Sequence, residues 1–396
     1  MTTPSLTSPK VAAHAWIEES DCRLDDFRDE VLNSVTELSD YPFAQEVRGG
    51  VLVYSADAFS AATSPSLRKQ LQAELIRAFA DGPGVIMIEG AFDHAVVDSA
   101  SAAFRDLIAE QHAAGGPAGD HFGKPGANDR IWNAAQKLAL HSPEVFADYY
   151  TNDVLAMVSQ AWLGPRYQVT SQVNVVNPGG AAQVPHRDYH LGFVDVDNLS
   201  AYPAHMHRMS AVLTLQGAVA HCDMPLESGP TMVLPHSQRF AAGYIAFYQP
   251  EFIEFFGEHY VQTPLRKGDA MFFNPALYHG AGTNTSADIS RMANLLQVSS
   301  PFGRAMESLD RGAMARAVYP SLREMQTAGR SPQELLNAVV ATAEGYPFPT
   351  NLDRDKPIGS LAPTSQVDVV LEALANDQTP AQLDAALRGQ DERRIP

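Results

Sequence analysis

The chain has 396 residues, of which 45% are hydrophobic and 19% charged, a composition that fits a globular protein with a sizeable core and excludes global disorder. Its formal net charge of -18 at pH 7 repels phosphate backbones and anionic membranes, so we expect neither nucleic acid nor a membrane as partner. The only two cysteines, Cys22 and Cys222, exclude a disulfide framework and a thiolate metal cluster.

The N-terminal residues 1–10 lack a cationic segment followed by an apolar run, and no apolar run is long enough to span a bilayer. We therefore expect a cytoplasmic protein with a small-molecule substrate. The oligomeric state stays open, because the amphipathic C-terminal tail could pack within the chain or on a neighbouring copy.

Residues 1–166 are predicted to be mainly helical. The spacing of apolar residues predicts helices over 64–80, 95–113 and 145–162, a shorter helix within 25–38, and a buried strand over 85–89. Residues 115–127 are rich in glycine and proline and include Asp120, His121 and Lys124, which indicates a long loop of the kind that often forms a functional lid.

Strand patterns dominate the middle of the chain, with predicted strands over 168–176, 210–219, 231–234, 269–273 and 291–299. Glycine and proline punctuate them, which is typical of a barrel or sandwich. Helical patterns return over 322–325, 332–343 and in two stretches within 364–388. We predict one α+β domain over 1–396, with a helical flank over 1–166, a strand-rich core over 167–300 and a second helical flank over 301–396.

A candidate metal site starts from His186-Arg187-Asp188. Residues two apart on a strand point to the same face, so the imidazole and the carboxylate would converge. The third ligand would be His279, which follows a turn and an apolar strand. Two histidines and one carboxylate leave three positions of an octahedral iron open, which is the ligand set of non-haem iron(II) oxygenases.

Each half of this pattern also has an ordinary structural explanation. A His-x-Asp triplet often arises by chance, and His279 could be a buried histidine bonded to a backbone carbonyl. A second pair, His205 and His207, lacks a matching carboxylate motif downstream. The order of the segments favours the first set.

Arg291 opens the last predicted strand of the core. An arginine on an apolar strand is costly unless it is paired, and its planar guanidinium is suited to binding a carboxylate through two hydrogen bonds. A dicarboxylate co-substrate that chelates iron through a 2-oxo acid end would meet Arg291 with its far carboxylate. The alternative is an internal ion pair with an aspartate or glutamate.

Four segments stand in a recognisable order, namely residues 184–190, 227–239, 266–273 and 278–284, the last followed by Arg291. In this order they resemble the phytanoyl-CoA dioxygenase family of iron(II)/2-oxoglutarate oxygenases, over about residues 168–300. One departure is Pro235-His236-Ser237, where Pro-Gly-Ser-His is usual. The resemblance implies a double-stranded β-helix (jelly-roll, cupin-like) core with flanking α-helices.

The resemblance also implies site residues. His186, Asp188 and His279 would be the catalytic ligands of Fe(II), and Arg291 would bind the distal carboxylate of 2-oxoglutarate, with O2 as the other co-substrate. Further candidate contacts to the co-substrate or substrate are Gln172, Asn174, Thr231 and Asn284. Related halogenating enzymes carry Ala or Gly in place of the carboxylate, so Asp188 favours hydroxylation over halogenation.

The predicted reaction is oxidation, in the first instance hydroxylation, of a C–H bond of a small or mid-sized metabolite with release of succinate and CO2. Candidate substrate contacts are the loop 120–131 together with Trp132, Tyr189, His190, Phe193, Phe302 and Arg304. Sparse lysine and the negative net charge disfavour a coenzyme A thioester. Two alternatives remain open: a metal-dependent cupin enzyme that does not use 2-oxoglutarate, and a non-catalytic jelly-roll binding protein.

Overall fold

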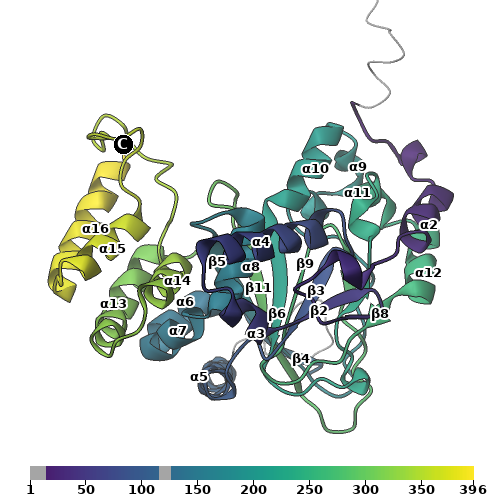
Figure 1. Cartoon of the computed structure of the whole chain (residues 1–396), viewed down its shortest axis with the longest axis horizontal. Coiled ribbons are helices and arrows are strands. Elements are labelled where there is room, and N and C mark those ends of the chain that lie inside the picture. Colours follow the sequence, from purple (N-terminus) through teal and green to yellow (C-terminus); the bar gives the residue numbers. More distant parts are fainter. Residues whose placement is uncertain (1–14, 116–125) are drawn as a thin grey trace, which may run out of the picture.

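The computed structural model of the chain describes residues 15–115 and 126–396, and two β-sheets form its centre (Figure 1). The larger sheet has the spatial order β1 (Glu46–Arg48), β2 (Val51–Ser55), β3 (Val85–Glu89), β9 (Ala270–Phe273), β6 (Thr214–Ala220), β11 (Arg291–Ser299), β5 (Gln168–Val176) and β4 (Asn128–Ile131). The smaller sheet consists of β10 (Tyr278–Gly280), β7 (Met232–Leu234) and β8 (Val261–Gln262). All strand pairs are antiparallel except β2 with β3.

Helices pack outside the sheets. Those before the core are α2 (Leu24–Leu32), α3 (Ala56–Ala61), α4 (Pro65–Ala80), α5 (His94–Ala113), α6 (Ala134–His141), α7 (Pro143–Tyr150) and α8 (Asp153–Leu163). Those within it are α9 (Val196–Leu199), α10 (Ala204–Val212), α11 (Gly243–Ala246) and α12 (Pro250–His259). Short 3-10 turns are η1 (Glu19–Asp21), η2 (Leu38–Asp40), η3 (His190–Phe193), η4 (Leu226–Ser228) and η5 (Ser237–Arg239).

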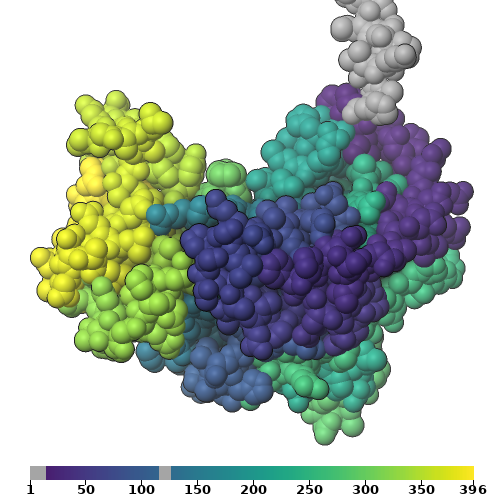
Figure 2. All heavy atoms as spheres, in the orientation of Figure 1, coloured from purple at the N-terminus to yellow at the C-terminus, as the bar shows by residue number. Residues whose placement is uncertain are grey.

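The C-terminal helices are α13 (Arg311–Thr327), α14 (Pro332–Thr342), α15 (Gln366–Ala375) and α16 (Pro380–Arg394). They gather at one end of the molecule, in green to yellow, and Figure 2 shows an indentation between this lobe and the region of α10. The two-sheet core with helices around it confirms the predicted α+β class with a jelly-roll core. No helix in the described part of the chain is long and apolar enough to cross a membrane.

Alternation along the strands separates a helix-facing side of the larger sheet from an interior side. On β11, Met292 and Val298 belong to the large core that packs against the helices, whereas Arg291, Leu295 and Gln297 face the space between the sheets. The same alternation continues on β5, β6 and β9 through the antiparallel registers. The larger sheet is therefore buried on both sides, and its interior side forms a cavity wall.

The structure differs from the sequence-based expectations at several element boundaries: the helix within 25–38 ends at Leu32, the helix over 322–325 begins at Arg311, and two further differences have a clear local cause. The single helix predicted over 145–162 is two helices, because the Asn152 side chain accepts the Leu155 N–H at 2.8 Å and starts α8 afresh. The strand predicted over 210–219 begins only at Thr214, since residues 210–212 end α10.

Two further expectations concern the first half of the chain. The flank 1–166 supplies strands β1 to β4 to the larger sheet as well as helices, while the division into 1–166, 167–300 and 301–396 stays a prediction. The predicted loop residues Asp120, His121 and Lys124 lie outside the described residues.

A buried hydrogen-bonded histidine ties the helices to the sheet. The Ser101 hydroxyl donates to the Val97 carbonyl at 2.7 Å, so its oxygen is free to accept from His221 Nδ1 at 2.8 Å. His221 Nε2 then accepts from the Tyr149 hydroxyl at 3.2 Å, and that oxygen accepts from Asn294 Nδ2 at 3.2 Å. This set of hydrogen bonds requires the neutral form of the His221 imidazole. Burial favours the same form, since it lowers the pKa of His221 to about 3.

This histidine makes stability fall in mild acid. Since the unfolded side chain has a pKa of 6.5 and the folded one a pKa of about 3, the unfolded state takes up a proton first as the pH drops below 6.5. The contribution to unfolding free energy lost by pH 5.5 is about 1 kcal/mol. We expect His221→Gln to show a smaller loss of stability than the wild type between pH 7.5 and 5.5 in urea unfolding. The exposed control His205→Gln should lose as much stability as the wild type. If His221→Gln also loses as much as the wild type, the prediction is wrong.

Candidate metal centre

Backbone pairing brings the two halves of the predicted metal motif together. His186 N donates to the His279 carbonyl at 3.0 Å, and His279 N donates to the His186 carbonyl at 3.2 Å. The next alternate residue, Asp188, donates its N–H to the Pro275 carbonyl at 3.0 Å. The segment that carries His186 and Asp188 is thus a strand-like neighbour of β10, and its alternate side chains point the same way.

The three side chains meet at one point. Ligand atoms of His186, Asp188 and His279 all lie within 4.8 Å of one another. His186 Nε2 is 3.7 Å from Asp188 Oδ1, and His279 Nε2 is 3.4 Å from Asp188 Oδ2. One ion can reach all three atoms, and the two nitrogens and one oxygen suit a divalent metal such as iron.

Both imidazoles are held with the same nitrogen free. His186 Nδ1 lies 2.9 Å from the Val184 carbonyl and His279 Nδ1 lies 2.9 Å from the Leu277 carbonyl. A carbonyl can only accept, so each Nδ1 carries the hydrogen and each Nε2 keeps its lone pair. Such outer hydrogen bonds fix the tautomer and ring orientation of metal-binding histidines.

The charges at this site favour ligands without protons. Burial lowers the pKa of His186, which keeps the imidazole neutral. Burial by itself would raise the pKa of Asp188, but the neighbouring His186 and His279 and a hydrogen bond from Gln216 lower it well below its usual range. A neutral imidazole and an ionised carboxylate are the forms that bind metal.

Arg187, between the two ligands, points to the opposite side and anchors the segment. Its guanidinium donates to the Ser237 carbonyl at 2.6 Å and the Phe240 carbonyl at 3.0 Å, and it lies 5.0 Å from the ring centre of Tyr244. A Cβ at Gly243 would lie 2.0 Å from the guanidinium carbon. The absence of a side chain at Gly243 therefore makes room for this anchor.

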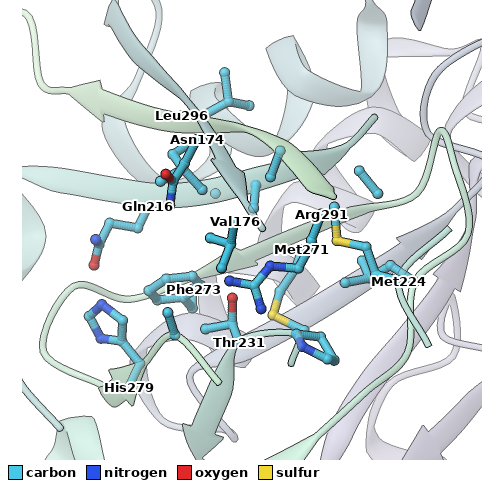
Figure 3. Close-up of a pocket in the computed structure, with 18 of the residues that line it drawn as sticks. Asn174, Val176, Gln216, Met224, Thr231, Met271, Phe273, His279, Arg291 and Leu296 are labelled. Carbon is cyan, nitrogen blue, oxygen red and sulfur yellow. The ribbon is translucent and has the colours of Figure 1, made fainter. Parts of the chain in front are cut away.

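A cavity between the two sheets runs from the metal ligands toward Arg291. Figure 3 shows His279 and Gln216 at one end, with Arg291 beside Thr231 further along. The wall beyond the metal ligands is largely apolar, with Met224, Leu265, Met271 and Leu295. A ligand with an acidic end, a short apolar middle and a metal-chelating end matches this lining.

Arg291 is a buried cation that contacts two backbone carbonyls. Its Nη1 donates to the Ser228 carbonyl at 3.0 Å and lies 3.4 Å from the Gly282 carbonyl, and no carboxylate pairs with it among the described residues. Burial lowers its pKa to about 10, so it stays charged at neutral pH. The internal ion pair considered from the sequence is absent from residues 15–115 and 126–396, which leaves the guanidinium available to an anionic ligand.

The other predicted contacts to co-substrate or substrate divide into two groups. Asn174 and Thr231 line the cavity. Gln172 is buried beside it, where it accepts from Arg130 and donates to Gln297 Oε1 at 3.2 Å. The amide of Asn284 donates to the Val176 carbonyl at 2.9 Å and the Ile289 carbonyl at 2.7 Å, so it fastens its loop to the end of β5.

The predicted substrate contacts are scattered. Tyr189 is buried directly after Asp188, and His190 is partly buried at the start of η3. Trp132 packs its ring 4.6 Å from the guanidinium carbon of Arg130. Three others, Phe193, Phe302 and Arg304, lie on the surface. Phe302 is the clearest case, with 71% of its surface exposed.

The second histidine pair does not form a metal site. His205 is exposed on α10, whereas His207 is buried, with Nε2 3.2 Å from the Leu199 carbonyl. The structure therefore places the two imidazoles on different sides of the helix.

Sequence reasoning missed three polar cavity residues, Gln183, Gln216 and Gln297, whereas Arg130 belongs to the segment 120–131 that was named as a candidate substrate contact. Gln216 donates its amide to Asp188 Oδ2 and so helps to hold the carboxylate. Gln216 and Gln297 lie in predicted strands, and alternation puts Gln297 on the same face as Arg291. The sequence could therefore have indicated Gln297 as a cavity residue. The pairing of Gln216 with Gln297, in contrast, depends on the register of the sheet.

The sequence matches the model of one protein family. Residues 80–293 match the family model described as phytanoyl-CoA dioxygenase (PhyH), which is more than half of the chain. A search of curated proteins gives no match.

Several solved structures are similar to part of the chain. The non-haem α-ketoglutarate-dependent carbocyclase SnoK from nogalamycin biosynthesis is 17% identical, over 63% of this chain and 92% of that one, with a TM-score of 0.45. HygX from Streptomyces hygroscopicus, solved with nickel, 2-oxoglutarate and hygromycin B, is 17% identical over 60% and 90%, with a TM-score of 0.45. EctD from S. alaskensis, solved with 2-oxoglutarate and 5-hydroxyectoine, is 19% identical over 59% and 77%, with a TM-score of 0.44.

Proposed function

The chain belongs to the phytanoyl-CoA dioxygenase family of iron/2-oxoglutarate oxygenases, as the four sequence segments predicted, and we propose that it hydroxylates a C–H bond of a small or mid-sized metabolite. Succinate and carbon dioxide would be the co-products. Three neighbouring ligand atoms at one end of a cavity support this proposal, together with a buried guanidinium further along.

In the proposed enzyme His186, Asp188 and His279 hold Fe(II), and Arg291 binds the distal carboxylate of 2-oxoglutarate beside Thr231. When bound, the metal and co-substrate supply oxidation by dioxygen coupled to decarboxylation. The protein contributes fixed ligands, a neutralising charge for the far carboxylate and a cavity that excludes water. Because Asp188 occupies the carboxylate position, hydroxylation is proposed rather than halogenation.

The observation that carries the proposal is the unpaired state of Arg291 among the described residues. A buried charge that meets only carbonyls is costly, and a dicarboxylate co-substrate would remove that cost. A metal-dependent cupin enzyme without 2-oxoglutarate would have no use for it. A non-catalytic jelly-roll protein would need neither this charge nor the three neighbouring ligand side chains, two of which are histidines with a free Nε2.

The test is anaerobic reconstitution with Fe(II), followed by metal analysis and titration with 2-oxoglutarate. We expect one iron per chain, a visible charge-transfer band on addition of 2-oxoglutarate, and succinate formation after admission of air. Iron binding without the band or succinate would support the cupin alternative. Failure to bind iron would support the non-catalytic one.

A further inference from the structure

A polar wall lies on the metal-ligand side of the cavity. Gln216 on β6 and Gln297 on β11 are direct cross-strand partners, and both line the cavity. Gln172 extends this row by donating to Gln297 Oε1 at 3.2 Å, and Arg130 donates to Gln172 Oε1. Amide groups thus cover the interior side of β5, β6 and β11 close to the triad, whereas the part toward Arg291 is lined mainly by apolar side chains.

Three buried oxygens in and next to this wall have no hydrogen-bond partner, and one of them, on Gln216, belongs to a side chain that lines the cavity. They are Gln216 Oε1, the Tyr189 hydroxyl and Glu307 Oε2, each buried and unsatisfied within the part of the chain that the structure describes. Buried polar atoms are nearly always bonded in folded proteins, so an unbonded one on a cavity-lining side chain such as Gln216 indicates a missing ligand or water. All three can accept a hydrogen bond.

Glu307 and Tyr189 belong to the same cluster as the amide row. Glu307 Oε1 accepts the Asn133 N–H at 2.7 Å, which leaves Oε2 as its free oxygen. Burial raises the pKa of Glu307, while the Asn133 N–H, Gln172 and the charge of Arg130 offset part of that rise. Burial also raises the pKa of Tyr189, and both Glu307 and Arg130 lie near enough to influence it.

The backbone at Tyr189 is held in an unusual conformation. Tyr189 has φ 64° and ψ 146°, and His190 has φ 46°, both in the positive-φ region that side chains rarely adopt. Such strain persists only where surrounding structure imposes it, and it concentrates at functional sites. Here it turns the chain immediately after Asp188, where the Tyr189 side chain is buried.

We propose that Gln216 and Gln297 on this wall, supported by the adjacent Gln172, Tyr189 and Glu307, recognise a polar substrate that donates hydrogen bonds through hydroxyl or amino groups, and that the wall disfavours a fatty acyl chain. The inference rests on the proposed function, because it assumes that the apolar part of the cavity near Arg291 holds the co-substrate. An acyl chain at the wall would leave the three oxygens buried without partners. The formal net charge of -18 also favours neutral or cationic ligands over anionic ones.

Binding is measured by calorimetry on the full chain loaded with nickel and 2-oxoglutarate, which needs no turnover. The probes are amino sugars, cyclitols and hexoses on one side, and dodecanoate and dodecanoyl-coenzyme A on the other. We expect the tightest binding among the donor-rich compounds, and the same compounds should stimulate succinate formation by the iron-loaded protein. Tighter binding of the acyl compounds, or no binding of any donor-rich compound, would overturn the proposal.

Two conservative variants test the wall itself. Glu307→Gln keeps an oxygen for the Asn133 N–H but replaces the free acceptor with a donor, and Tyr189→Phe removes one hydroxyl. Each should weaken binding of the best donor-rich probe about tenfold. The exposed Glu254→Gln, which removes the same charge as Glu307→Gln, is the matched control and should bind as the wild type does. Unchanged binding in both wall variants would refute the recognition role.

The outcomes separate this inference from the proposed function. If the wild type fails to bind 2-oxoglutarate in the presence of nickel, the oxygenase proposal fails whatever the probes do. If 2-oxoglutarate binds but acyl compounds are preferred, the oxygenase proposal stands and the inference about the wall is wrong. Thermal unfolding of each variant shows whether a loss of binding reflects a loss of folded protein.

Discussion

Replacing Asp188 with alanine is expected to lower succinate formation by more than about a hundredfold, because it removes the only carboxylate among the three proposed ligands. The carboxylate would contribute charge as well as a bond, because an ionised Asp188 would offset part of the positive charge of a bound metal. Without it, His186 and His279 offer two nitrogen ligands and no anion. Iron content after anaerobic reconstitution and the rate of succinate formation together check this expectation.

The control for Asp188→Ala is Asp197→Ala, an exposed aspartate on α9 that touches no proposed ligand. It should retain iron and activity. Were Asp188→Ala to keep one iron per chain and a rate close to that of the wild type, Asp188 could not be a ligand.

Replacing Arg291 with alanine is expected to raise the KM for 2-oxoglutarate by about a hundredfold or more while iron stays bound. Truncating one member of a buried, hydrogen-bonded charge pair costs roughly 2–5 kcal/mol, much of it because the other charge is left unpaired. In this case the stranded group would be the distal carboxylate. Arg291→Lys should fall between the wild type and the alanine variant, since lysine keeps the charge but not the paired geometry.

Arg311 provides a matched control for this experiment. It too is a buried arginine bonded to backbone carbonyls, Val169 at 3.0 Å and Ala341 at 3.3 Å, but it lies on α13 away from the cavity. Arg311→Ala should lower the midpoint of thermal unfolding and leave the KM for 2-oxoglutarate unchanged. If Arg291→Ala behaves in the same way, the cupin alternative without 2-oxoglutarate becomes the better explanation.

Local sequence patterns predicted those parts of the structure that local physics decides. The strands β3, β5 and β11 have the predicted limits, because short apolar runs between glycine and proline leave little choice. The helix α4 begins after Ser64 because its hydroxyl accepts the Leu67 N–H at 3.2 Å. Likewise, His186 and Asp188 share a face because alternate residues on an extended chain must do so.

Contacts between distant segments could not be predicted in the same way. Nothing near Gln216 in the sequence says that its amide reaches Asp188, because that contact requires β6 to pair with β9 and β11 in one register. Glu307 follows the core in sequence and accepts the N–H of Asn133, a residue far away in the chain. Conversely, Asn284 was expected to contact the co-substrate or substrate, yet its amide donates to the Val176 carbonyl at the end of β5 and to the Ile289 carbonyl of its own loop.

The alternation of β11 has a consequence for which changes in chain length the protein can tolerate. The strand is hydrogen-bonded to β5 on one side and to β6 on the other. An inserted or deleted residue would therefore change its register with both neighbouring strands at once. A shift of one residue would send the guanidinium of Arg291 into the hydrophobic layer beneath the helices and turn Met292 toward the ligand space. Insertions and deletions among natural variants should therefore be missing from residues 291–299 and accumulate in the connections between the C-terminal helices.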